Sequence, residues 1–380
     1  MYPFTLLIKP AGPDCNLACT YCFYARKSRL FGGKKHRMSD QVAEALVRDY
    51  MQLGFANCGF AWQGGEPTLM GLEFYRKVVE LQKLYGADGQ TVGNALQTNA
   101  VVLDNDEWGR FLHENKFLVG ISLDGPKTYH DHYRLDHAGR GSFDRVAAAI
   151  ETCRKYEVEF NILVLLNDQN VTAPDEIFDY LVELDIKYMQ FIPCVEQDEQ
   201  TRTILDFSIT PEQYGRFLCR LFDRWYEHGP RKVSVRMFDS ILSYCLHGRH
   251  TICTFSPKCD QYVVVEHNGD VFTCDFFVEE QWRLGNLLET PLGELASSSR
   301  KRQFAQHKRR VHNRCLVCRY HDLCRGGCLK ERLASGDSYQ AVSYLCEGYK
   351  MLFDHALPKF RELAAQLQLD PPHQNDQNGI

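Results

Sequence analysis

The chain has 380 residues, of which 44% are hydrophobic and 24% are charged, and this composition excludes disordered and fibrous proteins. Its 44 basic and 49 acidic side chains give a net charge of -5, which argues against a nucleic-acid partner because phosphate binding favours a basic face. The longest apolar runs, such as residues 162–166, are much shorter than the roughly 20 residues that span a bilayer. Residues 1–10 lack a basic start and a cleavage site, so we expect a soluble cytoplasmic protein with no membrane partner.

Apolar, strand-like segments alternate with amphipathic segments in the first half of the chain. Their periodicity predicts strands at residues 5–8, 58–62, 94–96, 117–123, 160–166 and 188–192. Helices are predicted between them, one capped by Ser39 or Asp40 and others at residues 74–85, 142–156 and 174–184. This alternation predicts an α/β fold whose parallel sheet is covered by helices and curved into a partial barrel.

Polar or glycine-rich turns follow the first four predicted strands. They are residues 15–22, 63–67, 97–99 and 122–126. Because chemistry in such folds gathers at the carboxyl ends of the strands, we expect these turns to share one pocket.

The alternation stops after the sixth predicted strand. Helices are predicted at residues 211–225, 238–246 and 349–367, the basic run 300–314 is predicted to be a solvated helix face, and residues 370–380 are predicted to be disordered. We expect a barrel domain at 1–232, a helical bridge at 233–252, a cysteine-rich domain at 253–348, and a C-terminal helix and tail at 349–380.

Sixteen cysteines in a chain of this size, without an export signal, favour reduced thiols or metal ligands over disulfides. Three of them form a CxxxCxxC motif and eight lie in the C-terminal part. The other five are predicted to be buried core thiols: Cys58, Cys153, Cys194, Cys219 and Cys245.

The CxxxCxxC motif consists of Cys15, Cys19 and Cys22. Three thiolates can ligate three corners of a [4Fe-4S] cluster, whereas a structural zinc site wants four protein ligands. An iron without a protein ligand is open to a small molecule. A structural metal knot or three unrelated core cysteines are the alternatives.

The C-terminal part carries cysteines enough for two fully ligated four-iron clusters, with paired structural zinc sites as the alternative. Redox activity separates the two, because zinc cannot accept an electron. These cysteines are Cys253, Cys259, Cys274, Cys315, Cys318, Cys324, Cys328 and Cys346.

The first motif resembles that of the radical S-adenosylmethionine (SAM) enzymes, in which an aromatic residue, here Tyr21, precedes the last cysteine. The second cluster resembles their SPASM domain. Nearly the whole chain is similar to the anaerobic sulfatase-maturating enzymes. The matching stretches are residues 6–10, 22–24, 63–69, 96–99, 122–126, 274–276 and 282–286. The resemblance implies a partial (β/α)6 TIM-like radical SAM barrel, a SPASM domain, three [4Fe-4S] clusters and SAM.

The resemblance also assigns the ligands of the two auxiliary clusters. It implies an inner cluster on Cys253, Cys259, Cys274 and Cys328. It implies an outer cluster on Cys315, Cys318, Cys324 and Cys346. The sequence spacing alone does not determine this interleaving.

The remaining site residues follow from the same resemblance. Contacts to SAM are implied for Tyr21, Gly64, Gly65, Glu66, Ser122, Arg134 and Val195. Glycines let the backbone approach a ligand closely, and a guanidinium suits the SAM carboxylate, although a surface ion pair is the alternative for Arg134. Substrate contacts are implied for Tyr24, Gln63 and Gln97, and the role of general base for Asp275, for which a structural aspartate is the alternative.

The implied reaction is the oxidation of a sulfatase cysteine or serine to formylglycine. A 5'-deoxyadenosyl radical removes a β-hydrogen, Asp275 takes the thiol or hydroxyl proton, and the remaining electron passes to the inner cluster. The implied partners are an unfolded or nascent sulfatase with a Cys/Ser-x-Pro/Ala-x-Arg motif and a reductant such as flavodoxin or ferredoxin. A radical SAM maturase that crosslinks a ribosomal peptide and a non-catalytic iron-sulfur electron carrier are the alternative functions.

Overall fold

The computed structural model describes residues 3–33 and 35–369. The contacts within the chain divide it into two compact units, Met1–Leu165 with Lys258–His307, and Leu166–Pro257 with Lys308–Ile380. Each unit joins segments that are far apart in the sequence, a division that differs from the sequential domain boundaries predicted above. In the described ranges, no helix has both the length and the apolar character needed to cross a membrane. The predicted disordered tail, residues 370–380, lies outside the described residues.

The first unit is built on one sheet with the strand order β10-β9-β8-β1-β2-β3-β4-β5. Neighbouring strands from β1 to β5 pair in parallel, as the sequence predicts. The strands are β1 (Thr5–Lys9), β2 (Asn57–Trp62), β3 (Thr91–Thr98), β4 (Leu118–Ser122), β5 (Phe160–Leu166), β8 (Tyr262–Glu266), β9 (Asp270–Phe272) and β10 (Arg283–Asn286).

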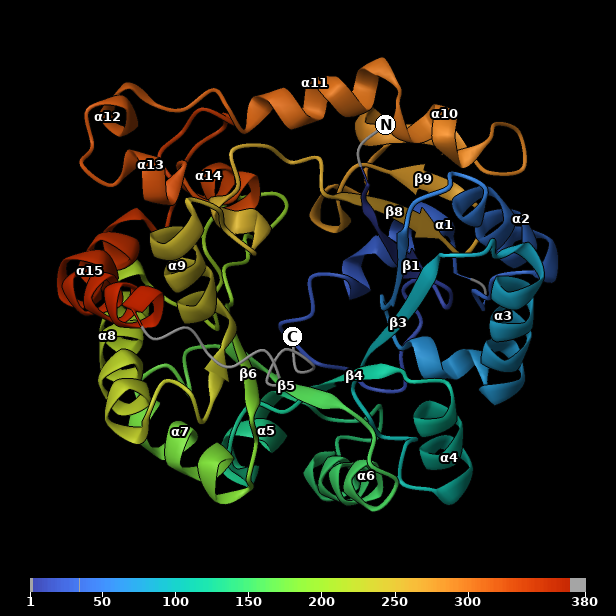
Figure 1. Ribbon diagram of the computed structural model, residues 1–380, viewed down its shortest axis with the longest axis horizontal. Helices are drawn as coiled ribbons and strands as arrows, with labels where there is room; N and C mark the ends of the chain where they lie inside the picture. The colour runs from blue at the N-terminus through green and yellow to red at the C-terminus, as the bar shows by residue number, and fades with distance from the viewer. Residues whose placement is uncertain (1–2, 34, 370–380) are drawn as a thin grey trace. The chain divides into compact units, whose positions relative to one another are not determined.

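Helices cover this sheet, and Figure 1 shows α2 and α3 side by side next to β1 and β3. The Ser39 side chain accepts a hydrogen bond from the Val42 backbone at 3.3 Å, which confirms it as the cap of α2. The helices of this unit are α1 (Ser28–Phe31), α2 (Asp40–Met51), α3 (Leu72–Tyr85), α4 (Asp106–Glu114), α5 (Lys127–Tyr133), α6 (Phe143–Lys155), α10 (Leu292–Ala296) and α11 (Ser299–His307). Short 3-10 helices span Ala25–Lys27, Pro67–Met70, Asp275–Phe277 and Glu280–Trp282. The sequence analysis did not predict α4 or α5.

Strand β8 extends the parallel sheet on the far side of β1. It pairs with β1 over its full length, with Ile8 opposite Val265 and Lys9 opposite Glu266, and β9 and β10 continue the sheet in antiparallel fashion. The sequence analysis did not predict these three strands. Their pairing brings the segment that follows Cys259 next to the strand that precedes the CxxxCxxC motif.

The four predicted polar turns follow the carboxyl ends of β1, β2, β3 and β4. Because these strands are parallel neighbours, the turns lie at one edge of the sheet. The placement of the four turns at one edge is therefore as predicted, and a pocket shared by them stays a prediction.

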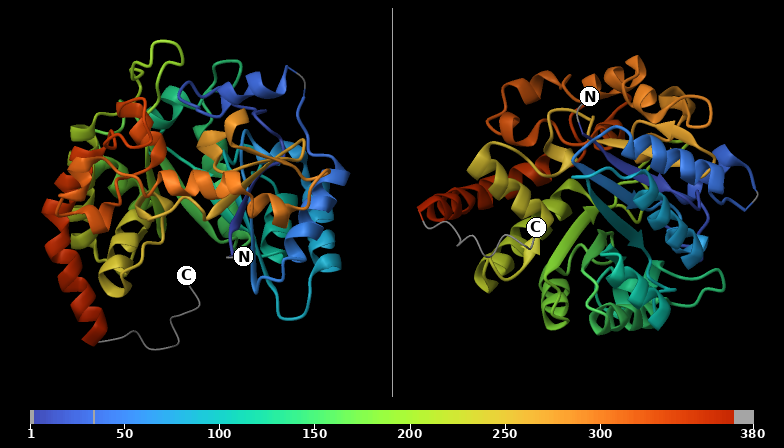
Figure 2. Two further views of the ribbon diagram at one scale, coloured as in Figure 1. Left: turned by 90° about the horizontal axis from the view of Figure 1, so that it is seen from above. Right: turned by 45° about the vertical axis from the view of Figure 1, so that its right-hand side comes forward.

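The second unit contains the remaining elements. Strands β6 and β7 pair in parallel, and α15 packs along α8 and α9, as Figure 2 also shows. Its elements are α7 (Pro174–Glu183), β6 (Tyr188–Pro193), α8 (Pro211–His228), β7 (Ser234–Val235), α9 (Arg236–His247), a 3-10 helix (Cys253–Phe255), α12 (Asn313–Leu316), α13 (His321–Cys324), α14 (Leu329–Ser335) and α15 (Cys346–Leu369).

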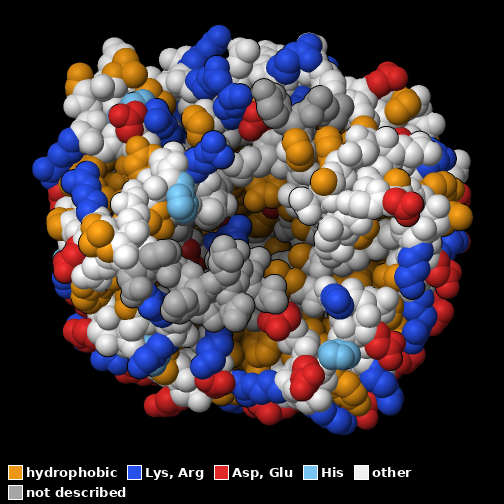
Figure 3. Space-filling view, viewed as in Figure 1, with side chains coloured by type: hydrophobic (Ala, Val, Ile, Leu, Met, Phe, Trp, Pro, Cys, Tyr) orange, Lys and Arg blue, Asp and Glu red, His pale blue; other side chains and the backbone are white. Residues whose placement is uncertain are grey.

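The basic run 300–314 is only partly a solvated helix face, because α11 ends at His307 and two basic side chains of the run are buried. Arg300, Arg302 and Arg309 are exposed, and Figure 3 shows Lys and Arg side chains along the upper edge where Figure 1 places α11. Lys301 and Lys308 are buried instead, because their ammonium groups donate hydrogen bonds to backbone carbonyls inside the protein.

The five cysteines outside the motifs lie where core thiols are expected. Cys58, Cys153 and Cys194 are buried, and Cys219 and Cys245 are half-buried. The prediction is therefore confirmed for the first three and holds in part for the last two.

Aromatic packing of α15 generates a prediction for the second unit. The ring of Phe360 is 4.8 Å from that of Phe222 and 5.9 Å from those of Trp225 and Phe238, and Phe360 is 1% exposed. We expect Phe360→Ala to lower the free energy of local opening by about 3–5 kcal/mol, because it leaves a cavity. Amide hydrogen exchange of α8 and α15, followed by mass spectrometry, measures this change.

The matched control is Leu369→Ala in the same helix, because Leu369 is 87% exposed. Exchange in α8 should remain as in the parent protein for this variant. Unchanged exchange in Phe360→Ala would contradict the packing role of Phe360.

Candidate active site

The CxxxCxxC loop follows β1 and is held by hydrogen bonds to its sulfur and backbone atoms. Cys15 Sγ accepts from the Leu17 N–H at 3.4 Å and from Asn99 Nδ2 at 3.5 Å, and the Cys22 N–H donates to the Cys19 carbonyl at 3.1 Å. Burial raises the pKa of the Cys15 thiol to about 12 and that of Cys19 to about 11. The three thiols lie close enough that charge on Cys19 or Cys22 acts on Cys15. This arrangement fits three ligands of one iron-sulfur cluster.

Gly64 and Gly65 make room for the loop that carries the cysteines. A Cβ on Gly65 would overlap the backbone of Asp14, and a Cβ on Gly64, where φ is +96°, would overlap the side chain of Lys9. The Glu66 N–H also donates to the Asp14 carbonyl at 2.7 Å. These two glycines therefore allow Asp14 and Lys9 to approach the turn closely. The contact of the glycines with SAM stays a prediction.

The buried carboxylate of Glu66 joins two of the turns. Its oxygens accept from Thr68 Oγ1 at 2.6 Å, Thr98 Oγ1 at 2.8 Å and the Asn99 N–H at 2.8 Å. Burial raises the pKa of Glu66, and these hydrogen bonds oppose the rise. Glu66 thus holds the turn after β2 against the end of β3, in addition to the SAM contact that the sequence analysis expected of it.

Arg134 is paired inside the protein with Asp124, which the sequence analysis did not single out. Its Nε and Nη2 donate to the two Asp124 oxygens at 2.9 and 3.1 Å, and Tyr21 OH also donates to Asp124. The guanidinium lies 5.6 Å from the centre of the Tyr21 ring. The pair is buried, so the alternative of a surface ion pair does not describe it. Tyr21 and Arg134 are thus brought together, and their contact with SAM stays a prediction.

The other implied contact residues lie at three places. Gln97 Nε2 donates to Ser122 Oγ at 3.3 Å, so these two are neighbours at the ends of β3 and β4. Gln63 directly follows β2, and its N–H donates to the Ile8 carbonyl at 2.8 Å. Val195 is buried in the second unit.

Asp275 lies beside a buried lysine that the sequence analysis did not assign. Its Oδ2 is 3.8 Å from Lys9 Nζ, and Lys9 Nζ lies 4.4 Å from the centre of the Tyr24 ring. Tyr24 OH donates to Glu266, which faces Lys9 across the β1–β8 pair. Burial, and then the charge of Glu266, raises the pKa of Tyr24. A signal for Lys9 and Glu266 existed in the sequence, because each is a charged residue that ends an apolar strand.

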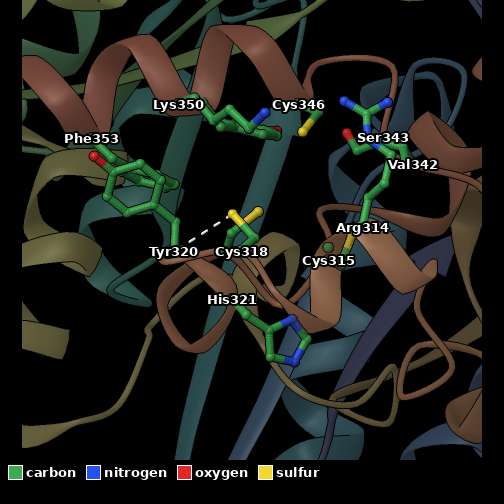
Figure 4. A pocket seen from close by; sticks show the side chains of 13 residues that line it. Arg314, Cys315, Cys318, Tyr320, His321, Val342, Ser343, Cys346, Lys350 and Phe353 are labelled. Carbon is green, nitrogen blue, oxygen red and sulfur yellow. Dashed lines mark hydrogen bonds between the residues drawn. The ribbon is translucent and has the colours of Figure 1, made fainter.

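The expected outer cysteines line a single cavity of about 160 Å³ in the second unit. Figure 4 shows Cys315, Cys318 and Cys346 around it, and Cys324 also lines it. The Tyr320 N–H donates to Cys318 Sγ at 3.5 Å. Four thiols on one cavity fit a cluster with four protein ligands.

The expected inner cysteines belong to both units. Cys259 and Cys274 lie in the first, and Cys253 and Cys328 lie in the second. In the first unit Cys274 Sγ is 3.7 Å from Asp275 Oδ1, so a thiol and the expected base are direct neighbours.

Among the described residues, no three His, Cys, Asp or Glu side chains converge on the position of a single metal ion. The cysteines of a four-iron cluster each bind a different iron, so convergence on one point is not expected of them.

Two family models match the chain, the radical SAM superfamily at residues 10–181 and the SPASM iron-sulfur cluster-binding domain at residues 253–319. A cysteine-type anaerobic sulfatase-maturating enzyme of Clostridium perfringens is 39% identical, over 97% of this chain and 100% of that protein. A serine-type anaerobic sulfatase-maturating enzyme of Bacteroides thetaiotaomicron is 37% identical, over 94% of this chain and 90% of that protein. The solved structure of native anSMEcpe with bound AdoMet and Cp18Cys peptide has a TM-score of 0.89 and 38% identity, and the match covers 96% of this chain and 100% of that chain. The predicted fold class, a radical SAM domain followed by a SPASM domain, is confirmed.

The contact between Gly65 and Asp14 leads to a prediction for the cluster expected on the CxxxCxxC motif. Because a Cβ at Gly65 would overlap the Asp14 backbone, we expect Gly65→Ala to displace the cysteine loop. The variant should lose the iron expected on Cys15, Cys19 and Cys22 and retain the iron expected on the C-terminal cysteines. Iron analysis and electron paramagnetic resonance of the reconstituted protein measure both.

Gly93→Ala is the control, because a Cβ on Gly93 has no atom within 4 Å. It should retain all the iron. A Gly65→Ala variant with the full iron content and normal SAM cleavage would show that the close approach is not needed.

Proposed function

The chain belongs to the radical SAM superfamily and, within it, to the anaerobic sulfatase-maturating enzymes, and from this we propose that it oxidises a sulfatase cysteine or serine to formylglycine. Similarity over nearly the whole length to cysteine-type and serine-type enzymes supports both target residues. The observation that carries the chemistry is the position of Asp275, 3.8 Å from a buried ammonium and on the segment that follows Cys274. It offers a charged base in the unit that also holds Cys15, Cys19 and Cys22.

The cofactors of this reaction are SAM and three [4Fe-4S] clusters. Cys15, Cys19 and Cys22 would hold the cluster that binds SAM, and the eight C-terminal cysteines would hold the inner and outer clusters. When bound, the first cluster and SAM supply a 5'-deoxyadenosyl radical for removal of the β-hydrogen atom, and the auxiliary clusters supply an acceptor for one electron.

Asp275 takes the proton that the target thiol or hydroxyl must lose. The side chain loses one hydrogen atom, one proton and one electron in all, which yields an aldehyde from serine and a thioaldehyde, then hydrolysed, from cysteine. The Lys9 ammonium lies 3.8 Å from Asp275 Oδ2, and this ion pair positions the carboxylate. Lys9 is 1% exposed, so its own charge is held in place by the protein.

The residues that bind cofactor and substrate carry the roles implied by the resemblance. Tyr21, Gly64, Gly65, Glu66, Ser122, Arg134 and Val195 would bind SAM. Tyr24, Gln63 and Gln97 would bind the peptide. The Tyr24 hydroxyl donates to Glu266, and its oxygen can still accept a hydrogen bond.

The partner is a polypeptide that carries the sulfatase motif Cys/Ser-x-Pro/Ala-x-Arg, in an unfolded or nascent state. A solved relative contains a bound peptide, which supports a peptide substrate. A reductant such as flavodoxin or ferredoxin would supply the electron that SAM cleavage consumes. The names of the relatives favour sulfatase maturation over the crosslinking of a ribosomal peptide.

The test is anaerobic reconstitution with SAM, a reductant and paired peptides that carry cysteine or serine in the sulfatase motif. We expect mass spectrometry to show formylglycine, and a hydrazide reagent to label the aldehyde. A product that lacks the aldehyde and contains a crosslink would contradict the proposal and favour the peptide maturase.

Replacement of the base gives a sharper prediction. We expect Asp275→Asn to retain all its iron and to cleave SAM, while formylglycine formation falls on the order of 10²–10⁴-fold, because proton transfer loses its acceptor. Iron analysis, 5'-deoxyadenosine release and peptide mass measure the three quantities on one sample.

Glu280→Gln is the matched control, because Glu280 is an exposed carboxylate five residues further along the chain. It should make formylglycine at the parent rate. The same rate in Asp275→Asn would remove Asp275 from the mechanism.

A further inference from the structure

Two lysines of the basic run are buried although their neighbours are exposed. Lys301 is 5% exposed and Lys308 is 1% exposed, whereas Arg302 and Arg309, the residues that follow them, are exposed. Burying a long charged side chain is costly unless the charge is compensated. The proposed function assigns neither lysine a role.

Lys301 joins two segments of the first unit that each carry a cluster cysteine. Its Nζ donates to the carbonyls of Tyr262 and Thr273, the latter at 3.1 Å. Tyr262 lies three residues after Cys259, and Thr273 directly precedes Cys274. The ammonium is therefore held at the base of both thiol-bearing segments.

Lys308 repeats this arrangement in the second unit. Its Nζ donates to the carbonyls of Thr254, at 2.7 Å, and Gly327. Thr254 directly follows Cys253, and Gly327 directly precedes Cys328. Each lysine thus holds together the two segments of its own unit that carry the cysteines expected to bind the inner cluster.

In the described part of the chain, no carboxylate in direct contact compensates the positive charge of either lysine. Within residues 3–33 and 35–369, neither ammonium forms an ion pair with Asp or Glu, and their hydrogen-bond partners above are neutral carbonyls. Burial lowers the pKa of Lys301 to about 8, and negative charge on Cys274, Cys259 and Asp260 opposes this. A four-iron cluster bound by thiolates carries net negative charge, so it would supply the compensation that the protein lacks.

We propose that Lys301 and Lys308 are positioning residues, each of which supplies a fixed positive counter-charge to the cluster-ligating thiolates of its own unit. Lys301 does so for Cys259 and Cys274. Lys308 does so for Cys253 and Cys328. The proposal rests on the proposed function only in its assignment of these four cysteines to a cluster. A fixed positive charge stabilises the reduced, more negative state of such a cluster and raises its reduction potential. Each lysine would therefore make a cluster bound by the cysteine pair of its own unit a better acceptor of the electron that leaves the substrate.

The test uses Lys301→Gln and Lys308→Gln, because glutamine keeps a hydrogen-bond donor for the carbonyls and removes the charge. Redox titration of the reconstituted full-length protein, followed by electron paramagnetic resonance, measures the midpoint potentials. Replacing Cys15, Cys19 and Cys22 with alanine in the same chain leaves only the auxiliary signals. We expect one auxiliary midpoint potential to shift to a lower value in both lysine variants.

Arg302→Gln and Arg309→Gln are the matched controls, since each removes one positive charge at an exposed neighbouring position. Their midpoint potentials should equal those of the parent. Unchanged potentials in the lysine variants, with full iron content, would overturn the proposal, because the lysines would then serve only to hold the backbone.

A third set of variants decides the case in which the glutamine variants lose iron. Lys301→Arg and Lys308→Arg keep the charge, so iron retained by the arginine variants alone would support a requirement for charge. Iron lost from both sets would overturn the proposal in favour of a purely steric role. Formylglycine formation by the parent protein tests the proposed function separately, because it depends on none of these substitutions.

Discussion

The active-site end of the sheet depends on one buried carboxylate, that of Glu66. Its oxygens accept hydrogen bonds from Thr98 and Asn99, and its backbone N–H donates to Asp14. Asn99 in turn donates to Cys15 Sγ, so three turns that follow three strands are joined through one group. A buried carboxylate is tolerated only when donors satisfy it, and this requirement holds each turn in place. The glycine before Glu66 allows the approach, because no larger residue fits against Asp14.

A second constraint is the pairing of β8 with β1, which brings residues 262–266 next to residues 5–9. Lys9 and Glu266 face each other at the ends of these strands, and Lys9 lies between the Tyr24 ring and Asp275. The proposed base thus lies beside the last residue of β1, although it belongs to the segment between Cys274 and β10. The strand that precedes the CxxxCxxC motif and the strands that flank Cys274 therefore belong to one sheet in the first unit.

Much of the first unit was predictable because its signals are local. Apolar periodicity located β5 at residues 160–166, and Ser39 was recognisable as a helix cap from its residue type and position. The pairing of β8 with β1 was not predictable, because its partner lies more than two hundred residues away and no local pattern names it. The same holds for Lys301, which resembles its neighbours in a basic run and whose ammonium donates hydrogen bonds to carbonyls distant in the sequence. The pairing of Arg134 with Asp124 was not predictable from residue type, because a guanidinium suits the carboxylate of SAM and that of a protein side chain equally.

The central claim is that the chain removes a hydrogen atom from the β-carbon of the target residue, and isotope transfer tests it most directly. A sulfatase-motif peptide with deuterium on that carbon is incubated anaerobically with the enzyme, SAM and a reductant, and the 5'-deoxyadenosine is analysed by mass spectrometry. The account predicts one deuterium in the 5'-deoxyadenosine for each formylglycine formed. Formylglycine accompanied by 5'-deoxyadenosine without deuterium would contradict it.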